Sequence, residues 1–346
     1  MPDVVKCLIW DLDHTLWSGT LLESDACRLR RGVRGVVEEL DRRGVLQSVA
    51  SRNDPDQAQQ LLQQKGLAHY FLHPHIGWES KVRSVRTIAE QLDVALDAVG
   101  FIDDEAFERE QVSHILPAVR TYPADACHVL PTLPEFSPAV LSPESRSRRA
   151  TYQGMEQRER AGETSGMSQS AFLAWCNTEL TLRYAVSGDL ARVLELLQRT
   201  HQLNSTGVVW EPDAIEGWLT DHRWRVFIAE LRDRFTDYGR IGVAACRRHK
   251  DRWELAVFLL SCRVLSRGIA GFFLAWVRRR AALDGATTLA ARYRANPRNH
   301  LIEQLFRLAG LEPREHESDG TVRFVGPTLP QARGPRWLTV HDGGIP

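Results

Sequence analysis

The stretch CLIWDLDHTLW, residues 7–17, decides how the first half of the chain folds. Its apolar start, CLIW, predicts a buried strand, and two carboxylates follow at Asp11 and Asp13. Because side chains alternate along a strand, positions 11 and 13 are expected on the same face. Two like charges this close need a cation or a shared proton. Mg2+ suits the position, since it prefers oxygen ligands and helps to neutralise phosphate.

From residue 4 to about residue 122, apolar strand-like runs alternate with amphipathic helical stretches. This alternation is typical of repeated βα units, which build a parallel sheet covered by helices on both faces. In open sheets of this kind, ligands bind at the carboxyl ends of the strands. We therefore predict an α/β domain over residues 1–132, with its site at that edge of the sheet.

Three further motifs place polar side chains at expected strand ends. SVASRND brings Ser51 to the end of the second strand, where its hydroxyl could donate to a phosphoryl oxygen. GWESK supplies Lys81 as a compact cation, and GFIDDE supplies Asp103 and Asp104 as further oxygen ligands. Alone, Asp-x-Asp could be a solvated turn and a lysine before a helix is usually at the surface. The ordered set favours a site that handles phosphate.

The amino-acid composition changes after the first predicted domain. Residues 133–170 are first rich in proline and serine and then polar and helical, which predicts a linker. An amphipathic helix, antiparallel strands and further helices follow, so we predict an α+β domain over residues 171–330. Residues 331–346 are rich in Gly and Pro and are predicted to be a flexible tail.

Composition limits the expected partners. The 346 residues suffice for two domains, and the formal net charge of +0 gives no electrostatic footprint for nucleic acid or an anionic membrane. The apolar runs fall short of about 18 residues, and the N-terminal residues do not show the basic region followed by a long apolar region that is typical of a signal peptide. Six scattered cysteines suggest neither a disulfide framework nor a zinc site. We expect a soluble cytoplasmic protein with reduced thiols and no nucleic-acid or membrane partner.

Residues 4–125 resemble the haloacid dehalogenase (HAD) superfamily in these motifs. In phosphotransferases of that family the first Asp attacks phosphorus and the second is the general acid and base. The resemblance implies these roles for Asp11 and Asp13, with Ser51 and Lys81 holding the transferring oxygens. Thr15 completes the D-x-D-x-T motif and joins the phosphate-binding set. The implied Mg2+ ligands are Asp11, Asp13 through its backbone carbonyl, Asp103 and the adjacent Asp104. The short spacing leaves room for a flap but for no cap domain.

Phrases from both halves, up to about residue 312, are similar to the FkbH-like family, in which a HAD domain is fused to a GNAT-like acyltransferase domain. They include KCLIWDLDHTLW, RFTDYGRIGV and FLLSCRVLSRGIAGFFLAW. The resemblance implies a glyceryl transferase/phosphatase of polyketide biosynthesis. Such a protein captures the acyl group of 1,3-bisphosphoglycerate, removes phosphate and delivers the glyceryl unit to the phosphopantetheine thiol of an acyl carrier protein, towards methoxymalonyl-type extender units.

This chemistry needs a thiol, because a thiolate attacks an acyl phosphate and thioester exchange is nearly isoenergetic. Cys262 is the candidate, since it ends the apolar run LAVFLLSC and precedes Arg263 and a helix N-terminus that could stabilise a thiolate or oxyanion. The alternative for Cys262 is a buried small hydrophobe. The surroundings of the other five cysteines are less suitable.

Polar residues in the shared phrases are further candidates. Gln202, Asn204 and Asn299 could orient the thioester or the glyceryl hydroxyls, or could instead be caps and turn formers. No role is assigned to His201. The usual GNAT phosphate loop reads Q/R-x-x-G-x-G/A, and LSRGIA has Leu265 at its first position. This departure argues against acetyl-CoA but leaves a pantetheine arm possible.

Two other functions remain open at this point. The first is a Mg2+-dependent small-molecule phosphatase whose second domain is a lid. The second is a carrier-protein docking scaffold with an idle HAD core. Such a scaffold would be expected to have lost one of the key residues of the first domain, but Asp11, Asp13, Lys81 and Asp103 are all present.

Overall fold

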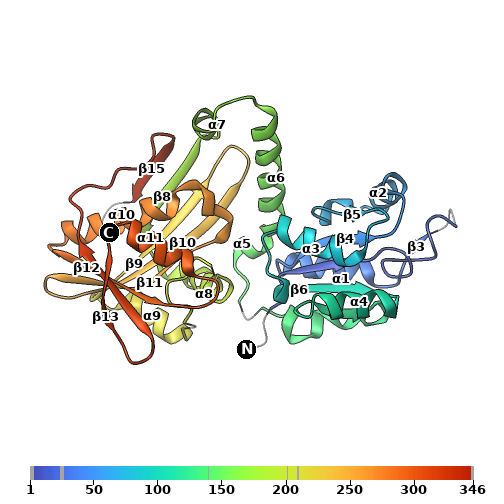
Figure 1. Cartoon of the computed structure of the whole chain (residues 1–346), viewed down its shortest axis with the longest axis horizontal. Helices are drawn as coiled ribbons and strands as arrows, with labels where there is room; N and C mark the ends of the chain where they lie inside the picture. The colour runs from blue at the N-terminus through green and yellow to red at the C-terminus, as the bar shows by residue number, and fades with distance from the viewer. Residues whose placement is uncertain (1–3, 24–26, 139, 201, 209, 344–346) are drawn as a thin grey trace. The chain divides into compact units, whose positions relative to one another are not determined.

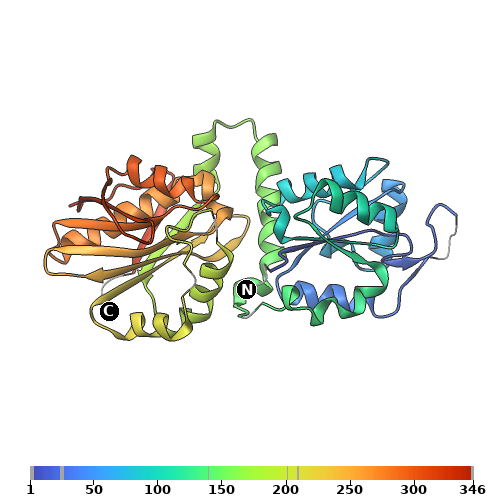
Figure 2. The same ribbon diagram turned by 60° about the horizontal axis from the view of Figure 1, so that its bottom comes forward.

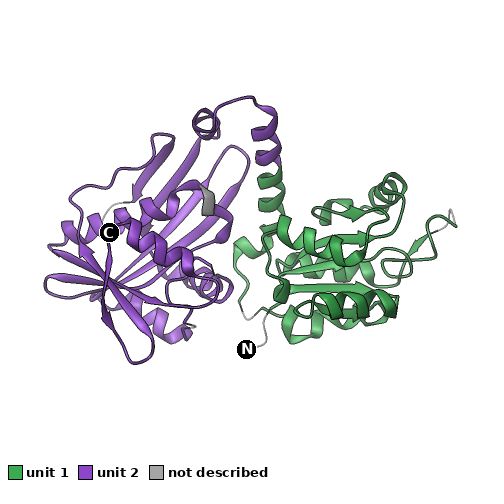
Figure 3. Ribbon diagram, viewed as in Figure 1, with its two compact units in different colours: residues 1–156 green, residues 157–346 purple. Residues whose placement is uncertain are grey.

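The computed structural model describes residues 4–23, 27–138, 140–200, 202–208 and 210–343. The chain divides into two compact units, Met1–Glu156 and Gln157–Pro346 (Figure 3). The boundary falls within helix α6 (Arg148–Thr164), inside the stretch 133–170 predicted as a linker. The start of this helix packs on unit 1, where Arg149 Nε donates to Asp41 Oδ1 at 2.8 Å. Among the described residues, no helix has the length and apolar character needed to cross a bilayer.

Unit 1 contains a five-stranded sheet in the order β5-β4-β1-β6-β7 (Figure 1). Its strands are β1 (Cys7–Trp10), β4 (Leu46–Ser51), β5 (His75–Ile76), β6 (Val99–Asp103) and β7 (Arg120–Pro123). All four neighbouring pairs are parallel. The helices are α1 (Val33–Arg42), α2 (Pro55–Gln64), α3 (Lys81–Gln91), α4 (Ala106–Ile115) and α5 (Pro143–Arg146). The predicted α/β fold of the first domain is confirmed.

Helices lie on both faces of this sheet (Figure 2), and a hydrophobic cluster fills the space between the sheet and the helices on each face. Leu8 and Trp10 pack with α1 and α2, whereas Cys7 and Ile9 pack with α3 and α4. Strand β1 therefore lies between two helical layers, which is why CLIW is a continuous apolar run and not an alternating one. A small antiparallel flap, β2 (Trp17–Ser18) with β3 (Arg28–Leu29), follows the first motif.

Unit 2 contains an eight-stranded sheet in the order β13-β14-β12-β11-β10-β9-β8-β15. Its strands are β8 (Thr178–Tyr184), β9 (Trp224–Arg232), β10 (Asp237–Arg248), β11 (Arg252–Leu260), β12 (Thr288–Arg294), β13 (Glu312–His316), β14 (Thr321–Pro327) and β15 (Leu338–Gly343). The helices are α7 (Gln169–Trp175), α8 (Leu190–Arg199), α9 (Pro212–Thr220), α10 (Ile269–Leu283) and α11 (His300–Leu308). In Figure 2, α10 and α11 lie on one face and α8 and α9 on the other. The predicted α+β fold is confirmed.

Short 3-10 helices complete both units. They are η1 (Ala68–Tyr70), η2 (Leu96–Ala98), η3 (Ala124–Thr132), η4 (Pro134–Phe136), η5 (Ser187–Asp189) and η6 (Cys262–Arg267).

The parallel strands β11 and β12 separate after a short pairing. They pair over four residues each, Arg252 to Leu255 with Thr288 to Ala291. Beyond that point Ser205 lies between them: its backbone N donates to Phe258 O at 2.9 Å, and its carbonyl accepts from Arg294 N at 2.9 Å. We call residues 203–206 the wedge segment. Its hydrogen bonds satisfy backbone groups that the divergence of the two strands leaves open.

The prediction of a flexible tail over residues 331–346 is wrong at residues 338–343. Residues Leu338–Gly343 form β15, which pairs in parallel with β8. Leu338 is buried, and Asp342 forms ion pairs with Arg279 and Arg280 of α10. Gly and Pro before residue 338 suggested a frayed end, but the pairing partner lies about 160 residues earlier in the sequence, so local composition carries no sign of it.

Leu338→Asp tests whether β15 contributes to the stability of unit 2. A buried leucine replaced by a charge loses apolar burial and leaves an unpaired carboxylate, so we expect the free energy of unfolding to fall by about 2 kcal/mol or more. Thr339→Asp, at an exposed position of the same strand, should change it by less than about 0.5 kcal/mol. Urea denaturation of the full chain measures both. Equal effects of the two variants would show that β15 packs loosely.

Candidate active site

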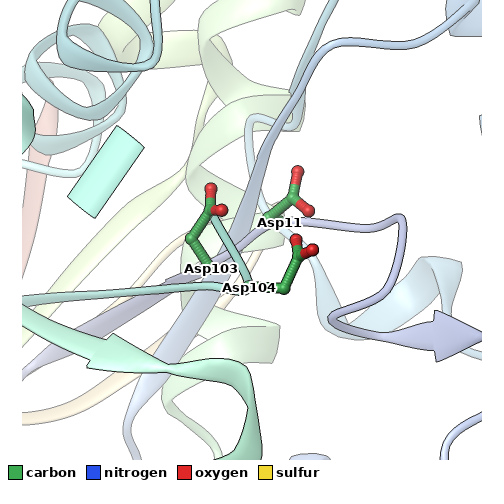
Figure 4. Close-up of side chains that lie close together, drawn as sticks. All are labelled: Asp11, Asp103 and Asp104. Atoms are coloured by element: carbon green, nitrogen blue, oxygen red, sulfur yellow. The ribbon is translucent and has the colours of Figure 1, made fainter. Parts of the chain in front are cut away.

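Three carboxylates gather at the carboxyl ends of β1 and β6 (Figure 4). Asp11 directly follows β1, Asp103 ends β6, and Asp104 is the next residue. Because β1 and β6 are parallel neighbours, their ends lie at the same edge of the sheet. One carboxylate oxygen of each residue lies within 4.8 Å of the others. Asp11 and Asp103 are 4% and 0% exposed and are largely removed from water, whereas Asp104 is exposed.

Lys81 supplies the positive charge that this buried cluster needs. It is the first residue of α3, whose N-cap Ser80 accepts a hydrogen bond from Arg83 N. Its Nζ donates to Asp11 Oδ1 at 2.8 Å and to Asp103 Oδ2 at 2.5 Å. The ammonium thus joins the ends of two strands to the start of a helix.

The buried charges shift one another's pKa values. Burial raises the pKa of Asp11 to about 7; Lys81 opposes this rise, and the charge of Asp103 adds to it. Burial also raises the pKa of Asp103, again against the attraction of Lys81. Burial acts to lower the pKa of Lys81, but the two carboxylates outweigh it and the net shift is upward. The cluster therefore holds more acid than its single buried cation compensates.

The donor set fits a divalent cation such as Mg2+. Asp11, Asp103 and Asp104 offer three hard oxygen ligands within reach of one centre, as Mg2+ prefers. Three carboxylates face one ammonium, so a double positive charge would complete the charge balance. The gathering of these three residues, expected from the sequence, is present.

Asp13 lies apart from this cluster. Strand β1 ends at Trp10, and the carbonyl of Leu12 accepts from the backbone N of residues 15, 16 and 17, so residues 12–17 form turns. Strand alternation therefore does not extend to Asp13, and the expectation of a shared strand face is wrong. Asp13 Oδ1 instead accepts from Trp17 Nε1 at 2.7 Å and from Leu21 N at 3.2 Å. This orients Asp13 as a candidate general acid and base, not as a carboxylate ligand.

Thr15 positions Asp104 and does not face phosphate as predicted. Its hydroxyl accepts from Asp104 N at 3.0 Å and donates to Asp104 Oδ1 at 3.3 Å. Thr15 is fully buried, so both bonds are within the protein interior. In place of the phosphate contact expected for Thr15, the structure shows its hydroxyl orienting the Asp104 carboxylate.

Ser51 ends β4 at the expected edge and is buried. Asn53, which sequence reasoning missed, donates from Nδ2 to Ser51 Oγ at a long 3.4 Å. Arg109 was also missed: its Nη1 donates to the backbone carbonyls of Asp103 at 2.8 Å and Asp104 at 2.7 Å. Asn53 stands in the motif SRND and Arg109 follows the motif FIDDE, but an asparagine or an arginine at such a position does not by itself indicate a functional site.

In unit 2, Cys262 begins η6 directly after the end of β11. It is partly exposed, whereas the other five cysteines are buried. Burial raises the pKa of the Cys7, Cys127 and Cys246 thiols, which makes their thiolates costly. Arg263 is partly exposed, and its Nε donates to Ser261 Oγ at 3.0 Å. Among the six thiols, Cys262 is the one that is not buried.

Asn204 and Asn299 are structural, which decides between the two roles left open for them. Asn204 Oδ1 accepts from Thr206 N at 3.2 Å and Gly207 N at 3.0 Å. Asn299 Nδ2 donates to the carbonyls of Asn204 at 3.0 Å and Arg294 at 2.9 Å. Both side chains are buried and hold the wedge segment in place, as the alternative role of caps and turn formers predicts.

The structure describes three further positions named from the sequence to different extents. Gln202 lies beside the wedge segment and is partly buried. His201 lies outside the described residues, as does the side chain of Leu265.

A buried network anchors the end of η6. Arg267 donates from Nη1 to Asp233 Oδ2 at 3.2 Å and from Nη2 to the Tyr238 hydroxyl at 2.6 Å. The Tyr238 hydroxyl in turn donates to Asp233 Oδ2 at 2.9 Å. Burial raises the pKa of Tyr238 to about 12, so it remains a donor. This network fixes the far end of the short helix that begins with Cys262.

Comparison with known proteins gives coarse likenesses. No protein-family model matches the sequence, and no curated protein does. Among solved structures, the N-terminal, phosphatase-containing part of BF1531 from Bacteroides fragilis, complexed with Mg, is 26% identical with a TM-score of 0.35 and matches 39% of this chain; the match spans 40% of the BF1531 structure. The ribosomal-protein-S18-alanine N-acetyltransferase from Escherichia coli is 16% identical with a TM-score of 0.35, and the match covers 45% of this chain and 97% of that structure. Spermidine N-acetyltransferase from Vibrio cholerae, in complex with CoA and spermine, is 14% identical with a TM-score of 0.34, and the match covers 43% of this chain and 95% of that structure.

All three TM-scores lie below 0.5, so the fold rests on strand order and connectivity. Those agree with the predicted classes, a HAD-like α/β domain followed by a GNAT-like α+β domain.

The raised pKa of Asp11 predicts a pH-dependent affinity for Mg2+. Below pH 7 the Asp11 carboxyl is mostly protonated and must release its proton to bind a cation. Affinity should therefore rise about tenfold between pH 6 and pH 8, with proton uptake by the buffer. Isothermal titration calorimetry in buffers of different ionisation enthalpy measures both. Asp13→Asn should keep this dependence, and a flat affinity would contradict the assignment.

Thr15→Val tests the orientation of Asp104. The variant keeps the side-chain volume and removes both hydrogen bonds, so we expect Mg2+ affinity to fall by about tenfold or more. Thr132→Val, which loses one exposed hydroxyl contact elsewhere in unit 1, is the matched control. Unchanged affinity in Thr15→Val would mean that Asp104 is held by its backbone alone.

Proposed function

We propose that the chain is a two-site enzyme, with a phosphatase site in unit 1 and an acyl-carrying cysteine in unit 2. The observation that carries the proposal is the buried arrangement of Asp11, Lys81 and Asp103 beside Asp104. As in the FkbH-like family that the sequence resembles, the substrate would be 1,3-bisphosphoglycerate. The product would be a glyceryl thioester on the phosphopantetheine arm of an acyl carrier protein, towards methoxymalonyl-type extender units.

In the phosphatase reaction Asp11 attacks phosphorus, the ester P–O bond breaks, and Asp13 gives a proton to the leaving oxygen. Asp13 then takes a proton from water, which attacks the aspartyl phosphate and releases inorganic phosphate and the Asp11 carboxylate. Trp17 Nε1 and Leu21 N hold the Asp13 carboxyl for both proton transfers. Lys81 and Ser51 would contact the phosphoryl oxygens. A bound Mg2+ would be held by Asp11, Asp103 and Asp104 and would neutralise phosphoryl charge.

In the acyl transfer reaction the Cys262 thiolate attacks the acyl carbon of the acyl phosphate. The C–O bond to phosphate breaks, inorganic phosphate leaves, and a thioester forms on the protein. The thiol of the carrier protein then attacks this thioester, and Cys262 leaves as a thiolate. The exposure of Cys262, at a strand end and before α10, supports this role.

The second candidate function is a Mg2+-dependent small-molecule phosphatase whose second unit is a lid. One observation favours it: Asn204 and Asn299, expected to orient an acyl substrate, are occupied by backbone contacts. The two candidates share the chemistry of unit 1 and differ in whether the protein ever carries a covalent acyl group.

Intact mass spectrometry of the full chain with 1,3-bisphosphoglycerate, Mg2+ and a phosphopantetheinylated carrier protein separates them. We expect a transient acyl adduct on the wild-type chain and a glyceryl adduct on the carrier protein. Cys262→Ala should lose the protein adduct and retain phosphatase activity, because its change is confined to the thiol. Asp11→Asn should leave phosphate on the adduct, since its nucleophile is gone.

Cys176→Ala, at a buried thiol of unit 2, is the matched control and should keep the adduct. An adduct that persists in Cys262→Ala would overturn the cysteine assignment. Loss of phosphate at the normal rate in Asp11→Asn would overturn the nucleophile.

A further inference from the structure

A pocket of about 400 Å3 adjoins the acidic cluster of unit 1. It is formed by the turn after Asp13, the flap, the start of α4 and the residues after β7. The lining residues are His14, Ser18, Arg30, Asp104, Arg109, Pro123, Ala124 and Asp125. Asp104 belongs both to this pocket and to the carboxylate cluster, so a molecule in the pocket lies next to the reacting phosphate. The volume is within the range of small-ligand pockets.

Three basic side chains line this pocket, although it adjoins a cluster of acids. Arg109 makes its hydrogen bonds to the Asp103 and Asp104 carbonyls from Nη1, which fixes the guanidinium beside the cluster. Arg30 donates from Nη1 to His14 O at 2.8 Å. A planar guanidinium suits a carboxylate or phosphate, because its parallel N–H groups match two oxygens.

His14 is held in an unusual backbone conformation at the mouth of this pocket. Its φ is 53°, a left-handed value that non-glycine residues rarely adopt and that is enriched at functional sites. Arg30 holds the His14 carbonyl, and the ring Nε2 lies 3.2 Å from Thr20 Oγ1. These contacts place an imidazole on the pocket wall one residue after Asp13.

The acidic partner of Arg30 is easily exchanged. Arg30 Nη2 pairs with Asp125, whose side chain is 94% exposed, whereas that of Arg30 is 28% exposed. An ion pair with such an exposed carboxylate contributes little, because water solvates the carboxylate nearly as well. An anion that enters the pocket can therefore replace Asp125 on Arg30 at small cost.

We propose that this pocket binds a second anionic group of the substrate, a carboxylate or phosphate a few atoms from the phosphate being removed. Arg30 is its main ligand, with Arg109 and His14 beside it. The inference rests on the proposed phosphatase activity of unit 1. Free 1,3-bisphosphoglycerate carries such a second group, whereas a phosphoglyceryl thioester does not.

Two phosphate esters that differ at one carbon test the proposal. 3-Phosphoglycerate has a carboxylate where glycerol 3-phosphate has a hydroxymethyl group. With the full chain and Mg2+, we expect kcat/KM for phosphate release to be at least tenfold higher for 3-phosphoglycerate. In Arg30→Gln the ratio of the two values should fall about tenfold, the range of one lost charge-assisted hydrogen bond.

Asp125→Asn gives the opposite sign. It removes the carboxylate that competes for Arg30, so kcat/KM for 3-phosphoglycerate should rise severalfold relative to glycerol 3-phosphate. Because Asp125 is exposed, the variant is expected to fold normally. Arg42→Gln, an exposed arginine of α1 that pairs with Glu39, is the matched control and should keep the wild-type ratio.

The outcomes distinguish a failure of the proposed phosphatase function from a failure of the proposed anion subsite. If neither ester releases phosphate in an Asp11-dependent way, the proposed phosphatase function fails and this inference fails with it. If release depends on Asp11 but Arg30→Gln lowers both substrates equally, Arg30 only braces the turn at His14 and the subsite is refuted. A lower ratio in Asp125→Asn would refute it as well.

Discussion

The fold of unit 1 must compensate the free-energy cost of burying the carboxylates of Asp11 and Asp103 side by side. Two carboxylates removed from water destabilise the fold unless a positive charge and hydrogen bonds compensate them. Lys81 contacts both, and it can do so because Ser80 caps α3 at the right position and because β1 and β6 are adjacent parallel strands. The order of the strands and the start of α3 thus bring the two carboxylates and their cation together at one edge of the sheet. Thr15 and Arg109 hold Asp104 beside this cluster.

Unit 2 meets a different constraint, the separation of β11 from β12. The wedge segment occupies the gap between the two strands. It is held by Asn204 and Asn299, whose side-chain amides form hydrogen bonds with backbone groups. Cys262 lies close by, directly after the end of β11, and is the one cysteine of the chain that is partly exposed. The Arg267–Asp233–Tyr238 network holds the other end of the same short helix, so its geometry is set from both sides.

Much of the phosphate site follows from the sequence, because strand ends and acidic motifs are local signals. Asp11, Lys81, Asp103 and Asp104 are found together for that reason. The placement of Asp13 was misjudged because β1 stops at Trp10, one residue before the motif. The roles of Asn204 and Asn299 stayed open at the level of the sequence because a polar side chain in a shared phrase can stabilise a turn as readily as it can bind a ligand. Strand β15 was missed because its partner is remote in sequence.

The outer strand β13 has a consequence for how the protein behaves at high concentration. Edge strands expose unpaired backbone groups and can recruit a second molecule into a continuous sheet. Here the sequence EPREH places Pro313, which has no N–H to donate, among Glu312, Arg314 and Glu315. Proline and dense charge are the usual protection against such polymerisation, so this eight-stranded sheet can end in water without nucleating aggregates.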